Sequence, residues 1–150
     1  MVAGGGDVML NSEKAQAIIE KQKPMNKSVV NRVKEAFAKK GVIVDQSEEL
    51  DKYLISQGKE AITFSNETII MHTKVSASGF YEELIHYGQI KSGQTVEGDK
   101  ENQLIMEIEA QKRLIKYQKS YKITDYEVEI LQNNLNDYNK KLKNLKKGGN

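Results

Sequence analysis

The sequence contains no cysteine, no tryptophan, one proline and two histidines. Without cysteine, the chain can form neither a disulfide nor a thiolate zinc site, and it has no cysteine nucleophile. Lys and Arg number 23 against 21 for Asp and Glu, and a formal charge of +2 predicts no general attraction to nucleic acid. No run of about 18 apolar residues and no signal-peptide pattern is present, so we expect no membrane segment.

The length of 150 residues and a hydrophobic content of 38% predict one globular domain. The glycine-rich start, residues 1–11, is typical of a flexible linker. We therefore expect a single domain over residues 12–147, delivered as the C-terminal part of a larger protein. The sequence does not indicate where that protein resides.

Three short apolar segments predict strands of a small sheet. Val42–Val44 is a β-branched run that follows Gly41. Residues 61–64 and 68–72 form two runs separated by a short polar stretch, 65–67. This pattern predicts a β-hairpin. Stretches with the apolar spacing of a helix lie before, between and after these segments. The sequence therefore predicts an α+β fold with a three-stranded sheet.

The second half of the chain predicts three helices. The first begins near Ser76 or Ser78, and a polar loop bracketed by Gly88 and Gly93 follows it. The second runs over residues 101–119. A capping box at Thr124 begins the last helix, which we expect to form a C-terminal helical hairpin with the helix before it.

The first of these helices carries two adjacent carboxylates and a histidine in the pattern Glu82-Glu83-x-x-His86. Residues four apart share a helix face, so Glu82 and His86 point the same way and Glu83 lies beside them. The pattern resembles the HExxH zinc motif, in which the glutamate is the general base that activates water. Glu82 stands at the position of the first histidine.

A second glutamate motif follows 21 residues after His86, at Glu107. The stretch Glu107-Ile108-Glu109-Ala110-Gln111 resembles the ExxA(D/N) element that supplies the third ligand in prenyl-protein-processing membrane proteases and in anti-repressor metalloproteases. Glu107 takes the ligand position, whereas Gln111 replaces Asp or Asn.

Together the two motifs resemble the gluzincin type of zincin-like metallopeptidase domain, as found in C-terminal toxin domains of bacterial polymorphic toxins and in phage head-morphogenesis proteins. The resemblance implies a minimal zincin-like core. It also implies a metal held by Glu82, His86 and Glu107, with Glu83 as catalytic base. Zinc is the expected metal, with manganese as an alternative because two carboxylates favour a harder ion.

The same resemblance implies a polypeptide substrate, a bacterial source and an immunity protein as a candidate partner. Gln111, Tyr81 and Tyr87 are the candidates for supporting the ligands or the transition state. No nucleic-acid partner is expected.

Three other interpretations remain open from the sequence. A nuclease toxin can use His86 and Glu83 as an acid and base pair without a ligand at Glu107. A degenerate zincin fold without a metal can serve only to bind a protein. The Glu-Glu-x-x-His run can also be an ordinary solvated helix face.

Overall fold

The structure, a computed structural model, describes residues 3–4, 12–64, 67–94 and 99–148. Within these ranges the chain forms an α+β fold, as predicted. The helices are α1 (Ser12–Lys21), α2 (Lys27–Ala38), α3 (Glu48–Ser56), α4 (Ala77–Lys91), α5 (Lys100–Lys116), α6 (Gln118–Tyr121) and α7 (Asp125–Lys147). The strands are β1 (Ala3–Gly4), β2 (Ile43–Asp45), β3 (Ala61–Thr63) and β4 (Thr68–Met71).

The sheet contains the three predicted strands in the order β3-β4-β2, with β1 added beside β3. Strands β3 and β4 pair antiparallel, which confirms the hairpin, and β2 joins β4 in parallel. The middle of the predicted turn, 65–66, lies outside the described residues. Strand β2 begins one residue later than predicted because the Val42 N–H donates to the Phe37 carbonyl at the end of α2.

Strand β1 lies within the stretch predicted to be a linker. Ala3 and Gly4 pair antiparallel with Thr63 and Ile62 of β3. Two residues give no periodicity from which a strand can be recognised. The rest of that stretch, 5–11, lies outside the described residues.

Two predicted boundaries in the second half of the chain are wrong. Helix α4 continues through Gly88 to Lys91, and Gly93, with a φ of +101°, follows its end. The helix predicted over 101–119 is interrupted at Tyr117, after which α6 turns back to contact α4. The ring of Tyr121 stacks on that of Tyr81, and this contact holds α6 against α4.

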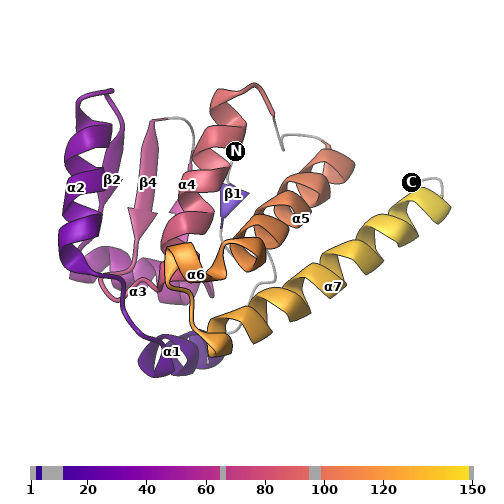
Figure 1. The fold of residues 1–150 in the computed structure, drawn as a ribbon, viewed down its shortest axis with the longest axis horizontal. Coiled ribbons are helices and arrows are strands. Elements are labelled where there is room, and N and C mark those ends of the chain that lie inside the picture. Colours follow the sequence, from indigo (N-terminus) through magenta and orange to yellow (C-terminus); the bar gives the residue numbers. More distant parts are fainter. Residues whose placement is uncertain (1–2, 5–11, 65–66, 95–98, 149–150) are drawn as a thin grey trace.

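Helix α4 occupies the centre of the molecule. It packs against β3 on one side and against α5 on the other, and its Phe80 side chain is fully buried. Figure 1 shows α5 and α7 side by side on one flank of α4, with β4, β2 and α2 on the other flank. Among the described helices, none is long and apolar enough to cross a membrane.

Candidate metal centre

The N-terminus of α4 is fixed by contacts from distant parts of the chain. The Ser76 hydroxyl caps the helix by accepting the Gly79 N–H at 3.1 Å. The Glu60 carboxylate accepts the Ser76 N–H at 2.8 Å, and Glu127 of α7 accepts the Ser78 N–H at 3.0 Å. Negative groups are favourable at a helix N-terminus. The helix that carries the motif is therefore held by α7 and by the residue that precedes β3.

Glu82, His86 and Glu107 meet where α4 faces α5. The Nε2 atom of His86 lies 2.6 Å from Glu107 Oε1 and 3.4 Å from Glu82 Oε2. One potential ligand atom from each residue lies within 4.8 Å of the others, and the three residues are between 1% and 4% exposed. These residues form a buried group that can hold a metal ion.

The orientation of the His86 ring is set by Gln89. The Gln89 amide donates from Nε2 to the Met106 carbonyl at 3.0 Å, so its oxygen faces His86 Nδ1 at 2.8 Å. Because an amide oxygen only accepts, this network assigns a hydrogen to Nδ1 and directs Nε2 toward the two carboxylates. Histidine ligands of metals typically donate their other N–H to such an oxygen.

Two of the three glutamates, Glu107 and Glu83, have carboxyl groups oriented by hydrogen bonds. The Tyr138 hydroxyl of α7 donates to Glu107 Oε2 at 3.2 Å, which leaves Oε1 facing His86. The Thr63 hydroxyl of β3 donates to Glu83 Oε1 at 2.7 Å. Glu83 is fully buried beside the group. The sheet and the C-terminal helix thus each orient one carboxyl group.

Buried polar atoms without a hydrogen-bond partner are concentrated here. Among the described residues, the buried side-chain atoms in this state are Glu83 Oε2, His86 Nε2, Glu107 Oε1 and both amide atoms of Gln111. Each such atom costs about 1–3 kcal/mol. The short contact between His86 and Glu107 does not have the alignment of a hydrogen bond. His86 Nε2 and Glu107 Oε1 therefore face each other at short distance, and the protein gives neither atom an aligned hydrogen bond.

The ionisable groups at this site have strongly shifted pKa values. Burial lowers the pKa of His86, but the nearby Glu107 carboxylate outweighs this effect and raises the pKa well above its ordinary value. Burial raises the pKa of Glu83 to about 8, Glu82 and Glu107 add to the rise, and His86 opposes it. Without a metal, the surroundings therefore favour the imidazolium form of His86 and the neutral form of Glu83.

The ligand atoms of the group fit a divalent cation. Glu82 and Glu107 each offer a carboxylate oxygen, and His86 offers one ring nitrogen. Carboxylate oxygens and imidazole nitrogens are common ligands of divalent metals in proteins. The chemistry of these three side chains is therefore compatible with a bound metal ion.

The structure does not bring two of the predicted supporting residues to this group. The ring of Tyr81 stacks on Tyr121 with a centroid separation of 4.1 Å. The ring of Tyr87 packs on Phe37 at 4.9 Å, in the core beside the sheet. Both aromatic side chains belong to the packing of α4.

Gln111 is fully buried one helical turn beyond Glu107. Helix α5 runs back along α4 (Figure 1), and Glu107 contacts His86. Of the three predicted supporting residues, Gln111 is the one on the helix that supplies Glu107, and both of its amide atoms are buried without a hydrogen-bond partner.

Thr63, Gln89 and Tyr138 were not identified from the sequence. Gln89 follows His86 by three residues on one helix, and this spacing was a usable signal. Thr63 and Tyr138 reach the group through the tertiary fold and leave no local pattern. Their contacts show that β3 and α7 are part of the site.

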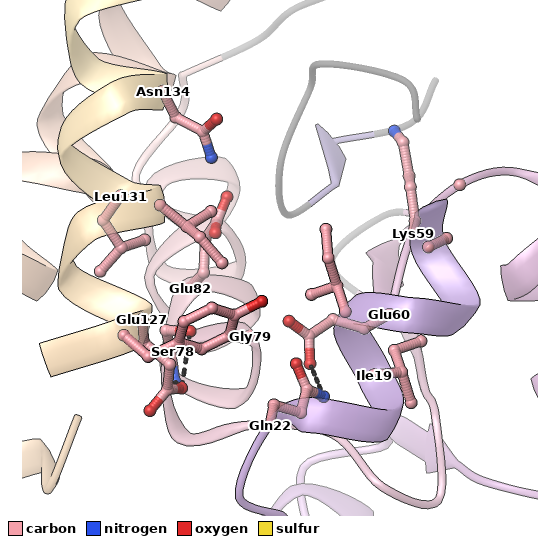
Figure 2. Close-up of a pocket in the computed structure, with 15 residues that line it drawn as sticks. Ile19, Gln22, Lys59, Glu60, Ser78, Gly79, Glu82, Glu127, Leu131 and Asn134 are labelled. Atoms are coloured by element: carbon pink, nitrogen blue, oxygen red, sulfur yellow. Dashed lines mark hydrogen bonds between the residues drawn. The ribbon is translucent and has the colours of Figure 1, made fainter. Parts of the chain in front are cut away.

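A cavity of about 150 Å³ lies beside Glu82. Figure 2 shows α7, with Leu131 and Asn134, on one side of it and α1, with Ile19 and Gln22, on the other. Glu82 lines this cavity and also belongs to the buried group. Glu82 is therefore the residue that the cavity and the candidate metal centre share.

Comparisons with protein-family models, with curated proteins and with solved structures find no match to this chain.

Proposed function

We propose that this domain is a metal-dependent hydrolase that cleaves peptide bonds. Glu82, His86 and Glu107 would hold one divalent ion, and Glu83 would act as the general base. The observation that carries the proposal is the meeting of these four side chains in one buried place where several of their polar atoms have no hydrogen-bond partner. A bound divalent ion would supply Lewis-acid activation of water.

The ligand set favours zinc or manganese. Imidazole is a good ligand for zinc, whereas carboxylates favour harder ions such as manganese. Two carboxylates and one imidazole lie between these preferences. The hydrogen bonds that Gln89 and Tyr138 make to His86 and Glu107 are of the kind that orients metal ligands.

Glu83 has the geometry of a proton acceptor. Its Oε1 atom is held by Thr63, and its Oε2 atom has no hydrogen-bond partner. A pKa of about 8 favours the neutral form of this carboxyl group without a metal. A divalent ion held by the neighbouring residues would favour the ionised form, and Glu83 would then take a proton from water and pass it to the amine that leaves.

The choice of a peptide substrate follows from the likeness of the two glutamate motifs to those of gluzincins. The same likeness leads us to propose a bacterial toxin or effector role. Expression in a bacterial host is then the first activity assay, because growth arrest can be scored before the substrate is identified.

The decisive experiment compares Glu83→Gln with the wild type. The variant keeps the shape and the Thr63 hydrogen bond but removes the base. Elemental analysis should find about one zinc or manganese per chain in both proteins. Growth arrest, and peptide cleavage once a substrate is found, should fall by about 10²- to 10⁴-fold in the variant.

Glu109→Gln provides the matched control, because Glu109 is an exposed acid on α5. It should leave metal content and activity unchanged, whereas His86→Ala should abolish both. Toxicity that survives both Glu83→Gln and His86→Ala would refute the hydrolase proposal.

A further inference from the structure

The cavity beside Glu82 has walls contributed by four parts of the chain. They are α1, the segment 58–60, the first turns of α4, and α7 (Figure 2). Its apolar wall residues are Ala15, Ile18, Ile19, Ile130 and Leu131, and the ring of Tyr126 lies among them. The cavity is therefore mainly apolar, although four charged residues, Lys59, Glu60, Glu82 and Glu127, also line it.

The carboxylate of Glu127 is already fully used by the protein. Its Oε1 atom accepts the Ser78 N–H at 3.0 Å and the Ser78 hydroxyl at 2.9 Å. Its Oε2 atom accepts the Thr124 N–H at 2.8 Å and the Thr124 hydroxyl at 2.9 Å. A carboxylate has about four acceptor sites. Glu127 thus has no acceptor site left for a cation in the cavity.

Glu60 is also engaged by the protein. It accepts from the Gln22 amide at 3.0 Å, from the Ser76 N–H at 2.8 Å, and from the Ser76 hydroxyl at 3.0 Å. Burial raises the pKa of Glu60, which weakens its preference for the charged form. Glu60 and Glu127 therefore stabilise the start of α4 and offer little to a positively charged ligand, whereas Glu82 belongs to the candidate metal centre.

The volume of the cavity limits the size of the group that it can hold. A cavity of about 150 Å³ lined by apolar side chains accommodates a molecule the size of benzene. A leucine, methionine or phenylalanine side chain has comparable dimensions. An occupant of this kind buries apolar surface, which favours binding, without displacing any of the hydrogen bonds of Glu60 or Glu127.

We infer that this cavity is the specificity pocket of the domain and that it takes an uncharged aliphatic or aromatic side chain of the peptide substrate. Glu82 lines the pocket and is also a proposed ligand, so a side chain bound there lies beside the metal centre. The identity of the occupant as part of a substrate rests on the proposed function. The preference for an apolar group rests on the pocket alone.

A binding experiment that needs no turnover tests this inference. The isotope-labelled full chain is titrated, with a chelator present, with the N-acetyl amides of leucine, phenylalanine and lysine, and amide chemical shifts are followed. The leucine and phenylalanine compounds should shift the signals of Gly58, Gly79 and Leu131, with Kd values at least tenfold below that of the lysine compound. Equal or tighter binding of the lysine compound, or no shift at these residues, would overturn the inference.

Two tryptophan variants on α7 provide the structural control. Ile130→Trp fills the pocket and should abolish binding of the leucine compound, whereas Glu129→Trp changes a neighbouring exposed residue and should leave it intact. Circular dichroism establishes that both variants fold. If Ile130→Trp binds as the wild type does, the ligand lies elsewhere and the inference is wrong.

The two proposals fail in different ways. Apolar binding in the pocket by a chain that takes up no metal would refute the hydrolase and support the pocket. Metal uptake together with cleavage after lysine or another charged residue would support the hydrolase and refute the apolar pocket.

Discussion

Zinc or manganese should stabilise the metal-free chain by an amount that the structure allows us to estimate. In the metal-free chain His86 Nε2 lies 2.6 Å from Glu107 Oε1, so a cation that contacts both atoms replaces this contact. The gain is therefore at most about 2–6 kcal/mol, the cost of two buried atoms that lack an aligned hydrogen bond. A ligand present at 100 times its Kd stabilises the folded state by about 2.7 kcal/mol. For a domain of this size that gain corresponds to a rise in Tm of about 5–11 °C.

Two variants of α5 identify the origin of this stabilisation. Glu107→Gln removes a ligand charge but retains an oxygen that can accept from Tyr138. The rise in Tm caused by zinc should be lost in this variant. Glu109→Gln changes an exposed carboxylate two residues away and should show the full rise.

Differential scanning calorimetry in chelator, in zinc and in manganese measures these shifts directly. A wild-type Tm that is the same in all three conditions would refute the reasoning, because the unpartnered atoms would then have no affinity for a cation. A zinc-dependent rise that is equal in wild type and Glu107→Gln would show that the ion binds elsewhere.

Three further predictions concern the surroundings of the centre. Gly79→Ala would place a Cβ 2.5 Å from Glu60 Cδ and should lower the free energy of unfolding by about 1–3 kcal/mol in urea denaturation. Gly88→Ala has open space around its new Cβ and should raise the free energy of unfolding by about 0.5–1 kcal/mol. Gln89→Leu removes the acceptor for His86 Nδ1 and should weaken metal affinity about 10- to 100-fold in a calorimetric titration. Because the pKa of Glu60 is higher in the folded than in the unfolded chain, its contribution to stability is complete below the unfolded pKa and is lost as pH rises through the folded pKa. The wild type should therefore lose stability relative to Glu60→Gln over that interval, and urea denaturation at a series of pH values would contradict this prediction if the difference stayed constant.

Elements with strong local signals were predictable from the sequence. The capping box at Thr124 and the β-branched and alternating runs of the sheet each correspond to an element in the structure. The break at Tyr117 was not predictable, because it depends on the stacking of Tyr121 on a residue 40 positions earlier, Tyr81. Strand β1 was missed for a similar reason, since its two residues form a strand only by pairing with β3.

The candidate ligand residues could be predicted from local sequence patterns, whereas the environment around them could not. Helical spacing brought Glu82 and His86 to one face, and the second motif supplied Glu107. The shifted pKa of Glu83 results from burial and from charges on another helix, neither of which leaves a pattern in the sequence. Tyr81 and Tyr87 were selected for their nearness in sequence, but residues 81 and 87 lie on helix faces that the packing of α6 and of the sheet requires.

Helix α7 contributes to the centre at two points along its length. Glu127 holds the N-terminus of α4 through Ser78, and Tyr138 holds Glu107 on α5. These two residues are eleven positions apart, about three helical turns, so both point from the same face of α7. A rotation of α7 about its axis would therefore release both contacts together. The packing of this one helix therefore determines the relative position of α4 and α5. It thereby also determines the distance between His86 and Glu107.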